Sequence, residues 1–501
     1  RKPAVFVLDQ DGMLHAFNAY TSSVTIGATV VQPGEELWAY IPQQAMAAMK
    51  VLGDVNYTHR YFVDGQIKVA DVNFGGGSTD WHTILVAGLG GGGTSYFALD
   101  VTDPLNPRYL WEFSDTNLGY TFANAGVTKL PTGQWAVLFS SGYNNTDGTG
   151  KLYAVNPKTG AIIAGYPISN GSGAPGTPSN LGKVALWVDD PLTNNTSQYA
   201  YAGDLNGDLW RFDLDYATAG HTGVQSFKLA HLASGGVAQP ITTKPELAQL
   251  SDGTRVVYVG TGKYLEIGDL TNTAVQSFYA IKDTLGGENL GGPGQTTWDP
   301  QTDTVSVAGV PSPAFLQRKF ISTDDLGHAL TVTTSSGSTV NVRKVCSGAS
   351  STVSASTGLC EHEGTVTMDW STYGGWYVNF PDSGERMNVD LKLVLGTLVF
   401  ATNIPSADSC TVGGKAWINQ LLGESGLPVP GGSGFTGTYI PDALAVGVTV
   451  VKLASGQYKS IVTKSNYQEQ TFDVDVPPGT SGARGGLLGK RSMWREFDEG
   501  Y

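Results

Sequence analysis

A run of glycines, Gly88 to Gly93, is the first stretch whose composition could do chemistry, because glycine-rich loops can hold phosphate groups. A nucleotide loop of this kind opens directly into a helix, whose first N–H groups bind the phosphate. Here the following residues, Tyr96 to Asp100, favour a strand. No Gly-Lys-Ser or Gly-Lys-Thr sequence occurs. We therefore interpret the glycine run as a hairpin turn.

Histidine and serine residues do not form a recognisable catalytic pattern. The 7 histidines never stand at a spacing typical of metal ligands, and neither G-x-S-x-G nor H-E-x-x-H occurs. His15 occupies a position that other copies of a recurring strand pattern fill with aromatic residues, so we expect packing to explain it. The sequence therefore favours a protein that is not an enzyme.

Arg60 and Asp64 flank two aromatic residues in the segment HRYFVDG, His59 to Gly65. An arginine and an aspartate at this spacing could recognise a ligand. They could equally form a buried ion pair that braces a loop, in which case their loss would lower stability more than function. Both interpretations remain open from the sequence.

The elements that must position these residues are β-hairpins built on one pattern. In Tyr199 to Asp215, apolar and aromatic residues alternate on both sides of a Gly, Asp and Asn turn, Gly203 to Gly207. One hairpin cannot bury its own apolar faces, so it requires copies. Its second strand, Leu209 to Asp213, recurs six times: Leu14–Asn18, Tyr96–Asp100, Leu152–Asn156, Phe278–Lys282, Trp376–Val378 and Ala416–Ile418.

A motif that recurs every few tens of residues is typical of repeat folds, and four-stranded blades around an axis leave no long open edge. A plain blade takes about 40–50 residues, so the wider spacing here indicates insertions. We predict an all-β, irregular β-propeller of seven blades, with six or eight as alternatives, in one domain over residues 1–501. A short helix is expected near residues 42–52, and an irregular insertion over 285–365.

Composition and charge narrow the possible partners. The chain has 66 glycines, only 15% charged residues and a formal net charge of −14. An acidic surface argues against nucleic acid and against electrostatic docking onto anionic lipid. The apolar run Leu391 to Ile404 is short and contains Lys392, so no transmembrane segment is expected in this fragment. The start at Arg1 suggests a piece of a longer protein.

The chain has 3 cysteines. Cys346 and Cys360 enclose a loop rich in serine and threonine and could form a local disulfide, which would imply an oxidising compartment. Whether they are joined stays open. For Cys410 we favour a buried free thiol.

Several long, ordered segments resemble one known family, the type IV pilus tip adhesin and biogenesis factors (PilY/PilC), in their C-terminal domain. The resemblance covers essentially the whole chain. It is carried by DGMLHAFNA, YIPQQAM, HRYFVDG, ALDVTDP, YAGDLNGDLWRFDL, GTGKYLEIGDL, SFYAIKD and SMWREF.

The resemblance implies a modified β-propeller similar to that of quinoprotein dehydrogenases, without their activity. It implies a role in pilus assembly, in opposing retraction and in attachment to surfaces or host cells. The expected partners are pilin or minor pilins and a surface or host-cell receptor. The expected location is the cell surface or pilus tip, reached through the periplasm and outer membrane. The alternatives are a quinone-dependent dehydrogenase and an ion-free scaffold that binds pilins.

No quinone is expected, because the adjacent cysteines usual beside that cofactor are missing from this sequence. The resemblance also implies a possible Ca²⁺ loop just before the strand at Tyr199. Oxygen ligands there could come from Asp189, Asp190, Asn194 and Asn195. The loop lacks a D-x-D-x-N spacing, and Pro191 interrupts it, so an ordinary hairpin loop is the competing interpretation. The segment Asn144 to Gly148 also offers oxygens, but a turn explains it better.

Overall fold

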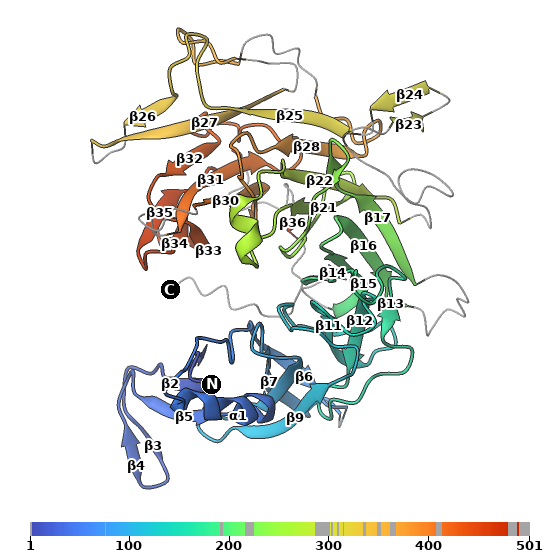
Figure 1. Ribbon diagram of the computed structural model, residues 1–501, viewed down its shortest axis with the longest axis vertical. Helices are drawn as coiled ribbons and strands as arrows, with labels where there is room; N and C mark the ends of the chain where they lie inside the picture. Colours follow the sequence, from blue (N-terminus) through green and yellow to red (C-terminus); the bar gives the residue numbers. More distant parts are fainter. Residues whose placement is uncertain are drawn as a thin grey trace. The chain divides into compact units, whose positions relative to one another are not determined.

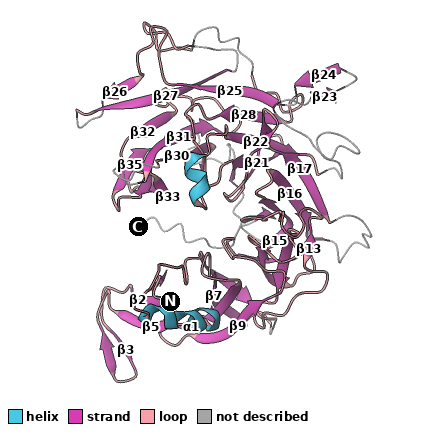
Figure 2. Cartoon of the chain, in the orientation of Figure 1, coloured by secondary structure: helices cyan, strands magenta, loops and turns pink. Residues whose placement is uncertain are grey.

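The computed structural model is built almost entirely of β-strands (Figures 1 and 2). It describes residues 3–75, 77–190, 194–215, 225–285, 301, 304–307, 310–313, 315–333, 337–347, 352–360, 367–406, 413–478 and 488–489. The short helix expected near residues 42–52 is confirmed as α1 (Gln43–Met49), which continues into the 3-10 turn Lys50–Gly53. A second 3-10 turn covers Ile267–Thr271.

The chain divides into two compact units, which are described separately. The first contains Arg1–Asp204 and Trp210–Phe227, and the second contains Leu205–Leu209 and Lys228–Lys490. Each unit has its own buried apolar clusters. Whether residues 1–501 form a single domain therefore stays a prediction.

The first unit begins with small antiparallel sheets. One has the order β1 (Ala4–Leu8), β2 (Leu14–Asn18) and β5 (Glu36–Tyr40), and β3 (Val24–Ile26) pairs with β4 (Thr29–Val31). A four-stranded sheet follows, in the order β6 (Ile67–Asn73), β7 (Trp81–Gly88), β8 (Ser95–Asp100) and β9 (Arg108–Ser114). Its up-and-down order is the one expected of a propeller blade.

An eight-stranded sheet joins two antiparallel groups through one parallel contact, Lys129 with Thr196. The first group is β13 (Ile168–Ser169), β12 (Lys151–Val155), β11 (Trp135–Ser140) and β10 (Gly126–Lys129). The second is β15 (Asn194–Gly203), β16 (Asp208–Asp213) and β17 (Ser226–His231), with β14 (Val184–Asp190) paired to β15.

The second unit is dominated by a twelve-stranded sheet. Smaller sheets pair β18 (Ala233–Ser234) with β19 (Val237–Ala238), β23 (Thr304–Val307) with β24 (Val310–Pro313), and β33 (Ala445–Lys452) with β34 (Tyr458–Lys464) and β35 (Glu469–Asp473). The large sheet runs β29 (Lys392–Val394), β30 (Thr397–Pro405), β31 (Gly414–Leu422), β32 (Gly437–Ile440), β27 (Thr339–Ser347), β25 (Phe315–Ile321), β28 (Gly375–Asn379), β22 (Ser277–Asp283), β21 (Arg255–Gly260), β20 (Glu246–Gln249) and β36 (Leu488–Gly489), with β26 (Thr331–Thr333) on β27.

All seven copies of the repeated pattern are strands with a partner on each side: β2, β8, β12, β16, β22, β28 and β31. An interior strand must be apolar on both faces where the sheet is covered twice. Accordingly, every residue of β8 is buried, whereas β2 alternates between buried and half-buried residues. The repeat therefore marks interior strands, sometimes more than one in a sheet, and β2 has one open face.

The number of blades stays a prediction, because two copies of the repeat are neighbours in one sheet. Tyr279 of β22 lies opposite Tyr377 of β28, and their rings stack at 5.9 Å. The extent of the insertion over 285–365 also stays a prediction. Much of it lies outside the described residues, and its described part includes β25 and β27 of the large sheet.

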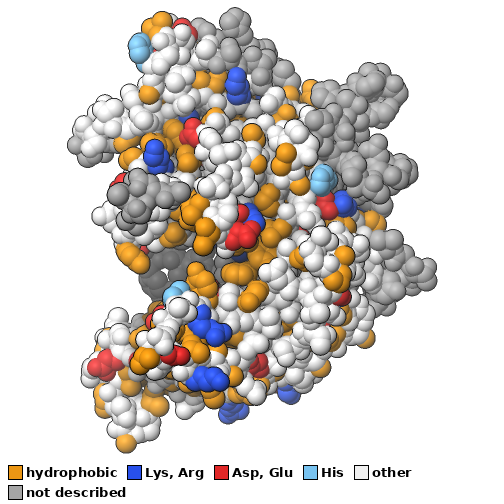
Figure 3. Space-filling view, in the orientation of Figure 1, with side chains coloured by type: hydrophobic (Ala, Val, Ile, Leu, Met, Phe, Trp, Pro, Cys, Tyr) orange, Lys and Arg blue, Asp and Glu red, His pale blue; other side chains and the backbone are white. Residues whose placement is uncertain are grey.

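Charged side chains are sparse and mixed in sign on the face drawn in Figure 3. Of the helices within the described residues, none combines the length and the apolar character needed to span a membrane. The described residues of this face form no large area of one charge, so we expect a functional site in small clusters of charged side chains.

Candidate functional site

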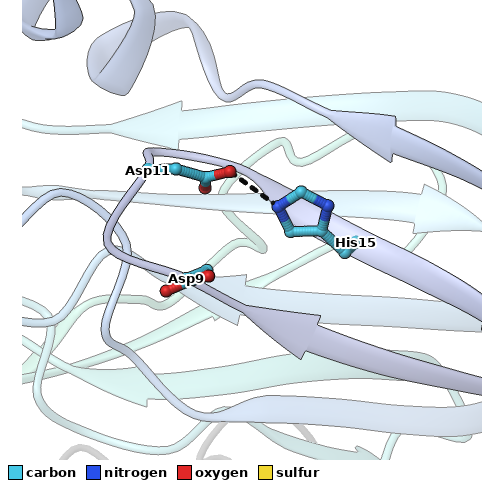
Figure 4. Close-up of side chains that lie close together, drawn as sticks. All are labelled: Asp9, Asp11 and His15. Carbon is cyan, nitrogen blue, oxygen red and sulfur yellow. Dashed lines mark hydrogen bonds and ion pairs between the residues drawn. The ribbon is translucent and has the colours of Figure 1, made fainter. Parts of the chain in front are cut away.

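Two carboxylates and an imidazole meet at the turn between β1 and β2 (Figure 4). Asp9 follows β1, Asp11 lies in the turn, and His15 is the second residue of β2. One ligand atom from each residue lies within 4.8 Å of the other two. The ring atom Nε2 of His15 is 2.9 Å from Asp11 Oδ2, and Nδ1 is 2.8 Å from Oε1 of Glu36 on β5. The imidazole is thus held between two acids.

The strand geometry explains this arrangement. Successive side chains of a strand point to opposite faces, so the burial of Leu14 and Ala16 turns His15 to the open face. A bulge in the β2–β5 pairing places Glu36 opposite Phe17. Glu36 is therefore a diagonal neighbour of His15 on the same face of the sheet. On the other side, Gly12 makes the tight turn with a positive φ of 92° that brings Asp11 back over β2.

The hydrogen bond with Glu36 raises the pKa of His15 above its ordinary value, and Asp11 adds to this while burial opposes it. When the ring is protonated, both N–H groups donate to carboxylates. When it is neutral, Glu36 can keep the proton on Nδ1 and leave the Nε2 lone pair facing Asp11. This is the orientation that carboxylate–histidine pairs give to metal-binding imidazoles. Asp9, Asp11 and His15 could therefore hold a divalent cation in place of the proton.

Packing accounts for only part of the surroundings of His15. Its ring stacks on Phe17 at 6.1 Å, but its two ring nitrogens also contact carboxylates that the sequence did not predict. The missed signal was the pair of aspartates two residues apart in a short turn, followed by a histidine on the next strand. Glu36 could not be anticipated, because its contact depends on a bulge 21 residues away.

The four residues expected to ligate calcium lie on a hairpin, with Asp190 paired to Asn194 across β14 and β15. The pairing is irregular on either side of Val188, where the register shifts twice. The indole Nε1–H of Trp187 donates to Asp189 Oδ1 at 2.8 Å. Residues 191–193 lie outside the described part of the chain. The described strands support the hairpin interpretation, and the calcium site stays a prediction.

The amides of this hairpin also differ from each other in exposure. The hydroxyl of Thr196 donates to Asn194 Oδ1 at 2.7 Å on the exposed side. Asn195 is 6% exposed, and its Oδ1 has no hydrogen-bond partner among the described residues. The two amides are adjacent in β15 and so do not share a face.

The segment Asn144–Gly148 forms a turn, as expected. The Asp147 carboxylate accepts from the backbone N–H of Thr149 at 3.0 Å and from the Asn145 amide at 3.1 Å. Lys151 pairs with the same carboxylate. These contacts hold the pKa of Asp147 below its ordinary value, with the Lys151 hydrogen bond as the largest lowering cause against a burial effect that raises it. The carboxylate is therefore engaged by the turn itself.

The glycine run is a hairpin turn between β7 and β8, as expected. Its N–H groups are occupied from within the chain, because Gly91 N–H donates to Asp64 Oδ1 at 2.7 Å. Burial raises the pKa of Asp64, and the N–H groups of Gly91 and Gly92 partly offset this. A Cβ at Gly92 would lie 1.9 Å from the carbonyl oxygen of Phe62. The Gly91 N–H group of this turn therefore binds the Asp64 carboxylate of the same chain, and not an external phosphate.

The same contacts bear on one of the two interpretations of Arg60 and Asp64, and ligand recognition stays a prediction. Arg60 is exposed, and its guanidinium carbon lies 5.6 Å from the centre of the Phe62 ring. The structure therefore does not support the alternative of a buried Arg60–Asp64 ion pair, because Arg60 is exposed and Asp64 binds the glycine turn.

Cys346 and Cys360 are joined by a disulfide, with their Cα atoms 5.9 Å apart. The bond links the end of β27 to the loop after it, within the second unit. Cys410 lies outside the described residues.

Comparisons with known proteins agree with the architecture. A model of the PilY1 beta-propeller domain matches residues 1–297. The type IV pilus biogenesis factor PilY1 of Pseudomonas aeruginosa strain UCBPP-PA14 is 31% identical over 460 residues, which are 84% of this chain and 36% of that protein. A PilY1 homolog of Xylella fastidiosa strain Temecula1 is 35% identical over 290 residues, which are 56% of this chain and 21% of that protein.

Among solved structures, the crystal structure of the Pseudomonas aeruginosa PilY1 C-terminal domain matches with a TM-score of 0.67 and 26% identity. The match covers 95% of this chain and 93% of that one. The sheets and these matches define the class: an all-β domain of the β-propeller type. The chain belongs to the PilY1 β-propeller family, which confirms the resemblance stated from the sequence. It spans about a third of the length of the Pseudomonas relatives.

Proposed function

We propose that this domain works in type IV pilus biogenesis without catalysing a reaction. In this role it supports pilus extension against retraction and contributes to attachment to surfaces or host cells. The observation that carries the proposal is the match to the PilY1 C-terminal domain over 95% of the chain. The relatives that match most of this chain are named type IV pilus biogenesis factors.

The proposed partners are pilin or minor pilins, together with a surface or host-cell receptor. The proposed location is the cell surface or pilus tip, reached through the periplasm and outer membrane. The Cys346–Cys360 disulfide supports a route through an oxidising compartment, because such bonds persist mainly outside the cytosol.

The experiment uses a piliated bacterium that lacks its own biogenesis factor. The full-length protein should restore surface pili, and a version without this domain should not. Removing the retraction motor as well should restore pili even without the domain. If pili stay absent in that double mutant, the domain does not act against retraction.

The alternative of a quinone-dependent dehydrogenase has a separate test. The proposal of a non-enzymatic domain expects no quinone absorbance and no dye reduction in calcium-containing buffer. A bound quinone with turnover would overturn it. The sequence supports the proposal, since it lacks adjacent cysteines.

We propose that calcium binds weakly or not at all at Asp189, Asp190, Asn194 and Asn195. Calcium prefers six to eight oxygen ligands. Only two of the four candidate residues are carboxylates, and Asn194 is exposed whereas Asn195 is buried. An ion-free scaffold that binds pilins stays the alternative, and a calcium titration that shows no binding would favour it.

A further inference from the structure

Two tryptophans border a depression of about 540 Å³ in the first unit. Trp81 begins β7 and Trp135 begins β11, so both stand where a hairpin turn enters a strand. The remaining residues of β11 are buried, and those of β7 are buried apart from His82. The largest apolar side chain thus occupies the exposed end of each strand. We call this depression the tryptophan groove; its lining residues are Asn73, Phe74, Gly75, Gly77, Ser78, Trp81, Lys129, Gly133, Gln134, Trp135, Asn156 and Pro157.

The two indoles form a fixed platform. Their ring centres are 5.7 Å apart and their planes meet at 77°, so the edge of one faces the other. Trp81 is 39% exposed, and Trp135 packs against the buried cluster of this unit. Edge-to-face pairs of this kind are favourable and hold the rings in place. The Trp81 indole is therefore partly exposed and held in place by its neighbour.

Phe74 closes one side of the groove and is held from two directions. The His82 ring stacks on it at 4.2 Å and 20°, and the ammonium of Lys158 lies 5.7 Å from its ring centre. His82 is itself held by Asp100, with 2.7 Å between Nδ1 and Oδ2. The wall is thus rigid before any ligand arrives, which reduces the entropy cost of binding.

Polar groups surround this aromatic surface. The lining includes Ser78, Lys129, Gln134 and Asn156, and it contains no acidic residue. Within the described part of the chain, no hydrogen bond or ion pair engages the side chains of Ser78, Lys129 or Gln134. Lys129 lies directly opposite Trp135 in the β10–β11 pair. One hydroxyl, one amide and one ammonium are therefore available beside the indoles.

We propose that the tryptophan groove binds a saccharide and prefers one that carries a carboxylate. A pyranose ring offers a face of C–H groups that packs on an indole, and hydroxyl groups around its rim that pair with amides and hydroxyls. Binding sites commonly combine an apolar floor with a few placed polar groups, and the groove falls in their size range. Lys129 supplies the charge for the carboxylate in a chain whose net charge is −14.

The groove is less suited to a proline-rich peptide, although aromatic grooves also bind such peptides. An extended peptide needs a row of aromatic rings along its length, whereas these two indoles meet edge to face at one point. The peptide is therefore kept as an outcome of the test. The proposal is independent of the role in pilus biogenesis.

The test uses the whole chain labelled with 5-fluorotryptophan, and the probes are 3′-sialyllactose, lactose and a proline-rich decapeptide. Resonances of Trp81 and Trp135 are assigned by Trp81→Phe and Trp135→Phe. We expect saturable shifts of these two resonances, tighter for 3′-sialyllactose than for lactose. No saturable shift with either sugar up to about 20 mM, or a response to the peptide alone, would overturn the proposal.

Variants separate the groove from general effects on folding. Trp81→Ala should weaken 3′-sialyllactose binding about tenfold, the size expected for one lost stacking contact. Lys129→Gln should remove the difference between the two sugars, and Gln134→Ala should weaken both. The matched control is Tyr467→Ala, at a fully exposed aromatic residue in the second unit. Binding that is unchanged by both Trp81→Ala and Lys129→Gln would contradict the proposal.

Discussion

Two charged clusters in this chain have similar partners and opposite surroundings. In the second unit, Arg343 and Glu385 form a two-armed ion pair at 2.8 and 3.0 Å, and both side chains are 0% exposed. In the first unit, His15 bridges Asp11 and Glu36, whose side chains are 38% and 45% exposed. Burial therefore separates a pair that can only support the fold from one that water or an ion can reach.

The buried pair is satisfied on every side. Arg343 Nε donates to Asn419 Oδ1 at 2.9 Å, and its guanidinium lies between the Phe320 and Trp417 rings, at 4.0 and 4.6 Å from their centres. A buried charge is tolerated only when its partners are complete. At His15, solvent can replace a lost partner, so the same kind of contact should contribute less.

The largest effect is expected from breaking the buried pair. Glu385→Ala should lower the free energy of unfolding by about 3–5 kcal/mol, because it leaves the Arg343 charge buried without a counter-charge. Chemical denaturation measures this. The control is the double variant Arg343→Met with Glu385→Leu, which should be more stable than Glu385→Ala. If the double variant is the less stable of the two, burial of an unpaired charge is not the cause.

The next effect concerns the same strand, since β27 carries both Arg343 and the disulfide-bonded Cys346. Cys360→Ser should lower the free energy of unfolding by about 3 kcal/mol, the chain-entropy value for a loop near 15 residues. The measurement is denaturation of the variant beside the oxidised parent. Equal stability of the two proteins would mean that the ion pair alone secures β27.

A smaller effect is expected at His15. Its pKa in the folded protein is raised above 6.5, so its stabilising contribution is complete below pH 6.5 and is lost as pH rises through the raised value. Glu36→Gln should therefore destabilise the protein by about 1 kcal/mol or less below pH 6.5, and the difference should shrink at higher pH.

Denaturation of the Glu36→Gln variant and the parent across pH 5 to 9, about the range where histidines titrate, measures this. The exposed pair Lys459–Asp473 provides a control, since Asp473 is 74% exposed and Lys459→Met should change little at any pH in that range. A loss in Glu36→Gln that grows as pH rises would contradict the assignment.

The smallest effect is expected from calcium at the β14–β15 hairpin. Titration of calcium into chelator-treated protein should show weak or no binding there, because two carboxylates and two amides supply few charged oxygens for the ion. A single micromolar or tighter site, lost in Asp189→Ala and in Asp190→Ala, would overturn this. It would also show that the hairpin is a better cation site than the turn at Asp11.

Local patterns in the sequence carried much of the fold. The alternation of apolar residues around glycine turns located β15 and β16, and the run of helix formers located α1. These features depend on neighbours a few residues apart, whose side-chain directions follow from strand and helix geometry. The recurrence of the strand motif predicted the β-propeller class, the resemblance to a known family implied the same class, and the comparisons confirm it.

The sites depended on contacts that local patterns do not carry. Whether His15 faced the core or water was set by the register of β2, and Glu36 reached it through a bulge. Arg343 and Glu385 are 42 residues apart in the chain, and Trp81 and Trp135 belong to different sheets.

The sequence alone determined which segments are strands and turns, because period-two alternation and glycine conformations act over a few residues. Only the tertiary structure decided which charged side chains are buried and which aromatic rings are exposed to solvent. Burial is a property of what packs on a strand, and those neighbours come from distant parts of the chain.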